Sequence, residues 1–261
     1  MSATGRLDSL HRRGAAVLAR IPHERARGTA LRRYGSALHR GSAVECPLCG
    51  GRYRHFKPAW NRGNALCWRC GSHERHRATW ILLTRRPELL EGAGSLLHFA
   101  PEWCLEQRLR SVPGLRYVTA DLDPALGDLA LDVTAIDLPD ASFDALLCSH
   151  VLEHVLDDRA AMRELHRVLV PGGWALVMVP LDHSRATTFE DASIVTPQAR
   201  QAAFWQSDHV RLYAPDIAER LSAAGFAVER KRLTDALGPE LASRYGLLAQ
   251  DDLFLCRRSV V

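Results

Sequence analysis

The feature that most constrains the fold is an alternation of short apolar runs with helical stretches from Ser95 to Val179. The apolar runs have the length and near-continuous hydrophobicity of strands that are buried on both faces. This alternation is typical of a parallel sheet covered by helices. We therefore predict an α/β, doubly wound domain. Its expected strands are residues 96–100, 115–120, 143–148 and 174–179, a short element at 130–134, and two further strands at 225–228 and 253–257.

Two longer helices are expected between these strands. One begins near Pro101 and ends at Arg110, and the other runs from His150 to about Leu169, where residues 171–173 (Pro-Gly-Gly) end it. Ligands of such sheets bind at the carboxyl ends of the strands. Functional side chains are therefore expected just after each strand.

Four of the seven cysteines form a regular pattern. Cys46 and Cys49 make one C-x2-C hook, and Cys67 and Cys70 make a second hook after a gap of 17 residues. This spacing predicts a structural Zn²⁺ site, because each hook places two thiolates on one side of a tight turn and four thiolates leave no open position. Disulfides are the alternative, which a reducing compartment disfavours. We predict a zinc-ribbon module at residues 44–77.

The segment after the second hook is expected to begin a helix with Ser72 as its N-cap. Glu74, Arg75 and His76 follow in its first turn. Two interpretations stay open for these three residues: they are surface charges, or they face a substrate.

Residues 1–43 form a basic segment that is expected to be helical. Residues 1–40 hold nine arginines against Asp8 and Glu24, and short helices are expected with interruptions at Pro22 and Gly28. Such an arm is able to hold an anionic partner such as nucleic acid. However, arginine is preferred over lysine along the whole chain, which disfavours nucleic acid as the reason for the charge. An amphipathic helix packed on the rest of the chain is the alternative.

Composition excludes several classes of protein. The 261 residues are 47% hydrophobic and 25% charged, as in ordinary globular proteins rather than disordered ones. No apolar stretch is long enough to span a membrane, and the first residues do not resemble a secretory signal. We expect a cytoplasmic protein without a membrane partner.

Two stretches carry a resemblance to a known family. Residues 138–155 read LPDASFDALLCSHVLEHV, and residues 164–175 read ELHRVLVPGGWA. They resemble the fourth-strand and fifth-strand motifs of class I S-adenosylmethionine-dependent methyltransferases, over roughly residues 79–261. The cysteine module is similar to the zinc ribbon that precedes this domain in some bacterial members. The resemblance implies a Rossmann-like, seven-stranded methyltransferase domain at residues 78–261, with a substrate cap at about 181–207.

The resemblance also implies which residues hold S-adenosylmethionine. The family's glycine-rich loop after the first strand is replaced here by a turn without glycine, so a weakened cofactor site is the alternative. In that turn, Glu102 is expected to meet the cofactor's amino group. Acidic residues after the second and third strands are expected to bind the ribose and the adenine. The full set of expected cofactor residues is His98, Ala100, Pro101, Glu102, Asp121, Leu122, Asp132, Val133, Cys148 and Ser149.

Three residues are candidates for work on the methyl acceptor. His150 and His209 are possible bases, and Arg211 is a possible clamp for a carboxylate or phosphate. For the segment around Arg211 the alternative is a helix-entry ion pair with Asp208. His154 is interpreted as a packed structural histidine. It has metal-ligand spacing with His150, but the sequence shows no third ligand, so no metal is predicted there.

Three functions follow from these observations. The first is a methyltransferase acting on O or N of a small molecule, such as a metabolite, a natural-product intermediate or a sugar. The second is an RNA methyltransferase that holds RNA with the zinc module and the basic arm. The third is a non-catalytic scaffold, which the missing glycines suggest. The sequence identifies neither the acceptor nor the oligomeric state.

Overall fold

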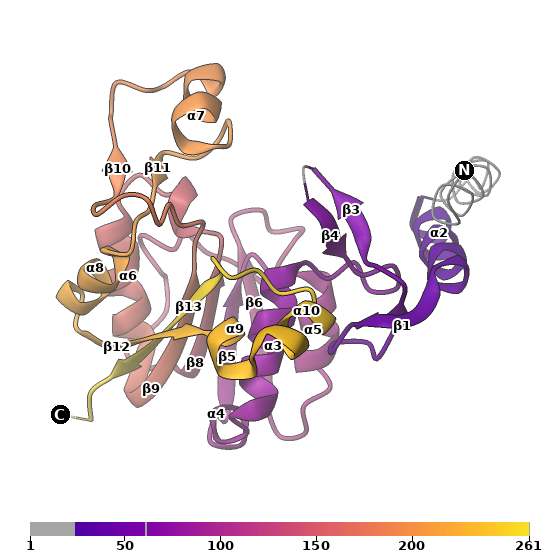
Figure 1. Cartoon of the computed structure of the whole chain (residues 1–261). Coiled ribbons are helices and arrows are strands. Elements are labelled where there is room, and N and C mark those ends of the chain that lie inside the picture. Colours follow the sequence, from indigo (N-terminus) through magenta and orange to yellow (C-terminus); the bar gives the residue numbers. More distant parts are fainter. Residues whose placement is uncertain (1–23, 61, 261) are drawn as a thin grey trace. The chain divides into compact units, whose positions relative to one another are not determined.

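The computed structural model describes residues 24–60 and 62–260 and divides them into two compact units (Figure 1). The first unit holds the described residues up to Leu82 together with Thr234–Leu248. The second unit holds Leu83–Leu233 and the chain after Leu248. The predictions for residues 1–23 lie outside the described residues.

The first unit combines short hairpins with helices. Its β1 pairs with β2, and β3 pairs with β4, both antiparallel. Helix α2 continues through Gly28, so the interruption expected there is not present. The elements are α2 (Glu24–Leu38), β1 (Arg40–Glu45), β2 (Arg52–Tyr53), β3 (Lys57–Ala59), β4 (Arg62–Leu66), α3 (Glu74–Arg85), which crosses into the second unit, α9 (Leu233–Leu237), which begins at its edge, and α10 (Pro239–Arg244).

A buried arginine connects the distant segments of the first unit. The guanidinium of Arg77 is fully buried and stacks over the ring of Phe56. It donates hydrogen bonds to the carbonyl oxygens of Ala65, Ser72, Tyr245 and Gly246, at 2.8, 2.8, 2.6 and 2.8 Å. A buried charge is stable only when its donors are satisfied. Arg77 therefore fixes the C-terminal segment 234–248 against the cysteine module.

The first turn of α3 is also buried. Glu74 is 1% exposed and pairs with Arg62 at 3.1 Å, and His76 is 5% exposed. The interpretation of these two residues as surface charges is therefore wrong.

The second unit is built on a seven-stranded sheet, which confirms the predicted fold class. The strand order is β12-β13-β9-β8-β5-β6-β7. All pairs are parallel except those of β13, which lies antiparallel between β9 and β12. The strands are β5 (Ser95–Phe99), β6 (Arg116–Asp121), β7 (Leu129–Ala130), β8 (Phe143–Ser149), β9 (Leu169–Met178), β12 (Phe226–Arg232) and β13 (Asp252–Arg258).

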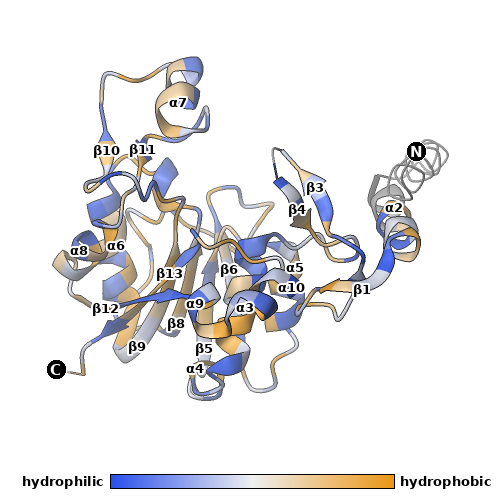
Figure 2. Ribbon diagram, in the orientation of Figure 1, coloured by the Kyte–Doolittle hydropathy of each residue, from blue (hydrophilic) through white to orange (hydrophobic). Residues whose placement is uncertain are grey.

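Helices α6 (Asp158–Val168) and α8 (Ile217–Ala223) share one apolar core with alternate residues of the strands, among them Leu97, Leu146 and Val177. Helices α4 (Glu88–Glu91) and α5 (Trp103–Leu109) also belong to this unit, and the Trp174 indole of β9 donates to the carbonyl of Leu89 at 3.0 Å. Figure 2 shows the strongly hydrophilic colouring of β12. Charged side chains on an edge strand disfavour pairing with other chains.

The prediction of a helix from His150 to Leu169 is wrong for the residues before Asp158. His150 has a left-handed backbone with φ of 56°, and a short 3₁₀ turn, η1 (Leu152–His154), follows it. Helix α6 begins only after Asp157, whose carboxylate accepts the N–H of Ala160 at 2.8 Å. Strand β9 then starts directly at Leu169 and includes the Pro-Gly-Gly segment, so these residues do not end the helix.

The predicted cap region contains a hairpin and a helix. Strands β10 (Phe189–Glu190) and β11 (Arg211–Leu212) pair antiparallel, and α7 (Pro197–Phe204) lies between them in the chain. Thr196 caps α7 by accepting the N–H of Ala199 at 3.2 Å. Figure 1 shows α7 standing away from the sheet, carried by these two strands.

Among residues 24–60 and 62–260, no helix is long and apolar enough to cross a membrane.

Candidate functional site: a pocket at the strand ends and a four-cysteine cluster

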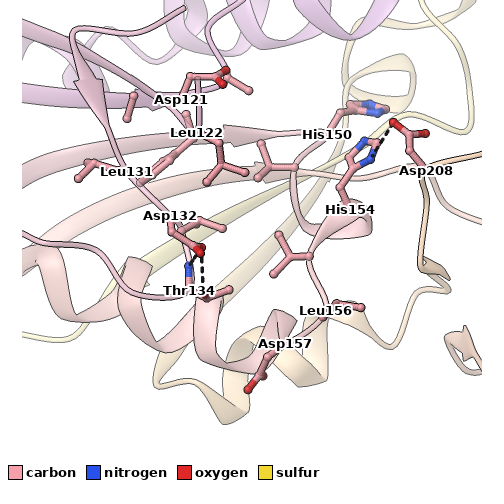
Figure 3. A pocket seen from close by; sticks show the side chains of 16 residues that line it. Asp121, Leu122, Leu131, Asp132, Thr134, His150, His154, Leu156, Asp157 and Asp208 are labelled. Carbon is pink, nitrogen blue, oxygen red and sulfur yellow. Dashed lines mark hydrogen bonds and ion pairs between the residues drawn. The ribbon is translucent and has the colours of Figure 1, made fainter. Parts of the chain in front are cut away.

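The second unit has a pocket of about 760 Å³ at the carboxyl ends of β5, β6 and β8 (Figure 3). This is the place where open α/β sheets bind ligands, and the volume suits a nucleotide-sized molecule. Its lining residues are Phe99, Ala100, Ala120, Asp121, Leu122, Leu131, Asp132, Val133, Thr134, His150, Val151, His154, Val155, Leu156, Asp157 and Asp208.

Two carboxylates lie on one side of the pocket, each held by a local turn. Asp121 ends β6, and its Oδ1 accepts the N–H of Asp123 at 2.9 Å. Asp132 Oδ1 accepts the N–H and the hydroxyl of Thr134, both at 2.8 Å. These bonds fix both side chains and use one oxygen of each. Leu122 and Val133 line the pocket beside them, as expected from the sequence.

The turn after β5 contains a residue with a left-handed backbone conformation, although it has no glycine. Ala100 has φ of 47° and lines the pocket, and its N–H donates to the carbonyl of Ala120 at 2.8 Å. His98 is buried beneath the turn, where its ring bonds to Tyr117 at 2.8 Å and to Glu102 at 3.1 Å. Pro101 and Glu102 follow Ala100 but do not line the pocket. His98 therefore supports the turn from beneath and does not line the pocket.

The residues at the end of β8 differ in whether they line the pocket. Cys148 is fully buried in the core shared with α6, and burial raises the pKa of its thiol. Neither Cys148 nor Ser149 lines the pocket, whereas His150 does.

Five polar side chains form a cluster at one wall of the pocket: His150, His154 and Asp208 line it, and Glu153 and His209 are buried behind them. His150 Nδ1 lies 3.2 Å from Glu153 Oε1, and His154 Nδ1 lies 3.3 Å from Asp208 Oδ2 (Figure 3 shows the second pair). The rings of His154 and His209 meet edge to face with centroids 4.8 Å apart. His209 is buried, and this burial lowers the pKa of its ring. His150 and His209 thus belong to one cluster, and His154 lines the pocket instead of packing in the core.

The guanidinium of Arg211 forms its hydrogen bonds with groups of the protein itself. Its side chain is buried and donates to the carbonyl oxygens of Leu152, Val155 and Leu156, and its Nε donates to Glu190 at 3.1 Å. These bonds hold the segment that forms one wall of the pocket. The structure therefore gives Arg211 a positioning role, and Asp208 pairs with His154 rather than with Arg211.

The four cysteines of the first unit form one cluster. Cys46 Sγ lies 3.6 Å from Cys70 Sγ, and Cys49 Sγ lies 3.5 Å from Cys67 Sγ. All four sulfurs lie within 4.8 Å of one another. A tetrahedral zinc site with Zn–S bonds of about 2.3 Å needs sulfurs about 3.8 Å apart. The cluster is therefore consistent with a zinc module.

Both hooks use the same backbone turn. Gly50 N–H donates to the carbonyl of Cys46 at 2.8 Å, and Gly71 N–H donates to that of Cys67 at 3.0 Å. Both glycines have positive φ, 67° and 70°, which other residues adopt only with strain. The repeated turn points the two thiolates of each hook toward a common centre.

Glu153 belongs to the cluster with His154 and His209 and was not predicted from the sequence. It is 1% exposed and lies between His150 and His154 in an otherwise apolar stretch. A single carboxylate among apolar residues, flanked by two histidines, is a signal that was available. Asp208 was considered only as a partner for Arg211.

The geometry defines an α/β domain with a nucleotide-type pocket at its strand ends. Comparison with known proteins is more specific, since residues 108–177 match a family model described as a methyltransferase domain. This match lies in the second unit, and the four-cysteine cluster precedes it in the chain.

Comparison with solved structures finds several similar chains at low identity. The 4+2 cyclase SpnF is 18% identical, with a TM-score of 0.51, over 85% of this chain and 99% of that chain. A Burkholderia thailandensis 1,6-didemethyltoxoflavin-N1-methyltransferase is 18% identical, with a TM-score of 0.47, over 71% and 78% of the two chains. An S-adenosylmethionine-dependent methyltransferase from Archaeoglobus fulgidus is 12% identical, with a TM-score of 0.48, over 70% and 94%. No curated protein sequence matches the chain.

Proposed function

We propose that this protein transfers a methyl group from S-adenosylmethionine to an oxygen or nitrogen of a small molecule. The observation that carries the proposal is the pocket at the strand ends, in which Asp121, Asp132 and His150 meet around one cavity. A methyl acceptor is required by the family, and its identity is the open part of the proposal.

The pocket residues suit the parts of S-adenosylmethionine, which supplies a methyl group on a positively charged sulfur. Asp121 accepts the ribose hydroxyls, and Asp132 with Val133 binds the adenine. The left-handed turn at Ala100 brings the backbone close to the ligand, and Glu102, Pro101 and the backbone around Ser149 support the methionine end. The negative charges favour a cationic ligand.

His150 is the proposed base. S-adenosylmethionine would supply the methyl group with a neutral thioether as the leaving group, and His150 would take the proton of an acceptor that is a hydroxyl or an ammonium group. Glu153 Oε1 lies 3.2 Å from its Nδ1 and orients the ring. Much of the acceleration comes from aligning the acceptor with the methyl group. His209 supports this end of the pocket, and Arg211 positions its wall.

RNA is the second candidate acceptor. A groove of about 370 Å³ in the first unit is lined by Arg40, Arg52 and Arg69, which suits a phosphate backbone. Arg52 is paired with Glu45 at 3.2 Å, which lowers the net charge of the groove. Binding to RNA would weaken steeply with salt, whereas binding to a small neutral acceptor would not.

Zn²⁺ in the four-cysteine cluster is the proposed structural metal. Four thiolates complete its coordination, so it stabilises the first unit and takes no part in the transfer.

Titration calorimetry with S-adenosylmethionine and S-adenosylhomocysteine tests the proposal. We expect micromolar binding, lost in Asp121→Ala without loss of the folded state. Asp191→Asn is the matched control, since Asp191 also accepts the N–H two residues ahead (2.9 Å) but lies in the cap. Full affinity in Asp121→Ala would refute the cofactor site. Binding without turnover of any acceptor would point to the different chemistry that the cyclase SpnF illustrates for this fold.

A further inference from the structure

Glu153, His154 and His209 each place a ligand atom within 4.8 Å of the others. They come from the 3₁₀ turn η1 and from the approach to β11, which are far apart in the sequence. Two imidazoles and one carboxylate form the donor set of catalytic zinc sites and of mononuclear iron sites, both of which keep positions open for a substrate. The cluster therefore has the composition and the spacing of a metal site.

The carboxylate of Glu153 is a second and independent observation. It is 1% exposed, and neither of its oxygens has a hydrogen-bond partner among the described residues. His150 Nδ1 lies 3.2 Å from its Oε1. Burying a carboxylate without hydrogen bonds is costly, unless a cation compensates the charge. A bound metal ion explains why this carboxylate is buried without a hydrogen bond.

Both histidines are also oriented as metal ligands usually are. His209 Nδ1–H donates to the carbonyl of Phe204 at 2.9 Å, and His154 Nδ1 lies 3.3 Å from the Asp208 carboxylate. Such a partner on one nitrogen fixes the ring and leaves the other nitrogen for a metal. The amide of Gln206 lies against His209 Nε2 at 2.5 Å. Because Gln206 is exposed, it is free to move away when an ion binds.

We propose that Glu153, His154 and His209 bind a first-row divalent transition metal ion at one wall of the cofactor pocket. Asp208 is a positioning residue that acts through His154. This site is separate from the four-cysteine cluster, whose ligands belong to the other unit.

The position of the site indicates what the ion would do. His154 and Asp208 line the pocket, so the open coordination positions are next to the place proposed for the methyl acceptor. An ion there orients an acceptor that offers two neighbouring oxygens and lowers the pKa of a bound hydroxyl. This substrate class, a chelating oxygen acceptor, rests on the proposed function, whereas metal binding itself does not.

Titration with Co²⁺ of protein that holds a single zinc ion per chain, in the four-cysteine cluster, tests the site. We expect one cobalt ion per chain to bind, with a spectrum that lacks thiolate-to-cobalt charge transfer because the donors are nitrogen and oxygen. His154→Ala and His209→Ala should each weaken binding by at least about tenfold, and Asp208→Asn by about 10–100-fold. His183→Ala is the control, because His183 lies in the same unit and outside the cluster. His154 is exposed, so its replacement leaves the core intact and keeps the test valid even where His209→Ala impairs folding.

Two results would overturn the proposal: no cobalt binding beyond the four-cysteine cluster, or equal affinity in wild type and His154→Ala. Neither result touches the cofactor site, which calorimetry with S-adenosylhomocysteine reports separately. Cobalt binding together with absent cofactor binding would retain the metal site and refute the proposed function.

Discussion

Ala100 and His150 follow the neighbouring parallel strands β5 and β8, and both have left-handed backbone conformations with φ of 47° and 56°. Both residues line the pocket. The sharp turns after β5 and β8, which bring the backbone to the pocket, are therefore made by residues that carry a Cβ atom. A weakened cofactor site was the alternative suggested by the missing glycine, and the left-handed backbone of Ala100 shows that the turn forms without one.

Ala100→Gly should not destabilise the protein, although Ala→Gly usually does. A left-handed conformation costs a residue with Cβ about 1–2 kcal/mol, whereas glycine loses about 0.5–1 kcal/mol through its freedom in the unfolded chain. We expect the free energy of unfolding to stay the same or to rise by up to about 1.5 kcal/mol, measured by urea denaturation.

Ala130→Gly is the control for this prediction. Ala130 lies in β7 and is not among the residues with positive φ, so the same change should cost about 0.5–1 kcal/mol there. Equal losses in the two variants would show that the turn at Ala100 is not strained.

Cys46→Ser should remove zinc from the four-cysteine cluster. The fourth thiolate is lost, and three sulfurs that lie close together lose the ion that holds them. We expect about one zinc ion fewer per chain by elemental analysis, and unfolding of the first unit at lower temperature. Cys104→Ser, which changes a buried thiol of α5 outside the cluster, should keep the full zinc content. Unchanged metal content in Cys46→Ser would contradict the zinc assignment.

The sheet was predictable because its strands are defined locally. The apolar runs at residues 96–100 and 143–148 each lie within one residue of β5 and β8. The break of the helix after His150 was not predictable, because it depends on the left-handed backbone at that residue, and the expected periodicity continues through it. The reversal of β13 likewise depends on its pairing with β9 and β12 rather than on its own residues.

The two candidate sites also differ in how far the sequence alone predicts them. The cysteine cluster follows from spacing within one short segment, so the sequence was sufficient. Glu153 and His209 meet only because β11 returns beside η1, and Arg77 reaches Tyr245 only because the chain returns to the first unit. Contacts of this kind leave no periodic signal in the sequence.

Arg211→Met should destabilise the second unit strongly. The arginine side chain is buried, and its loss leaves the carbonyl oxygens of residues 152, 155 and 156 without their donor. Removing one member of a buried charged network costs about 3–5 kcal/mol, which urea denaturation would show. The affinity for S-adenosylhomocysteine should fall as well, because the same segment lines the pocket. Arg185→Met, at an exposed site, should change stability by less than about 0.5 kcal/mol. Similar effects of the two changes would exclude the positioning role.

Glu164→Gln should destabilise the protein in a pH-dependent manner. Arg167 donates two hydrogen bonds to the carboxylate, at 2.7 and 2.8 Å, and the N–H of Ile136 donates a third at 2.8 Å. The Arg167 guanidinium is the main reason why the pKa of Glu164 lies below its ordinary value of 4.5. The folded state therefore favours the charged carboxylate. Its stabilisation is fully present above pH 4.5 and is lost as the pH falls through the lower pKa of the folded state.

The difference in unfolding free energy between wild type and Glu164→Gln should therefore be on the order of 1 kcal/mol at pH 7, since the group is partly exposed. It should shrink as the pH falls below 4.5, because wild type then also carries an uncharged side chain. Glu219→Gln, at an exposed position of α8, serves as the control and should show little effect at either pH. A difference for Glu164→Gln that stays constant from pH 7 to pH 3 would mean that packing, and not the charge on this carboxylate, holds residues 136–140 against α6.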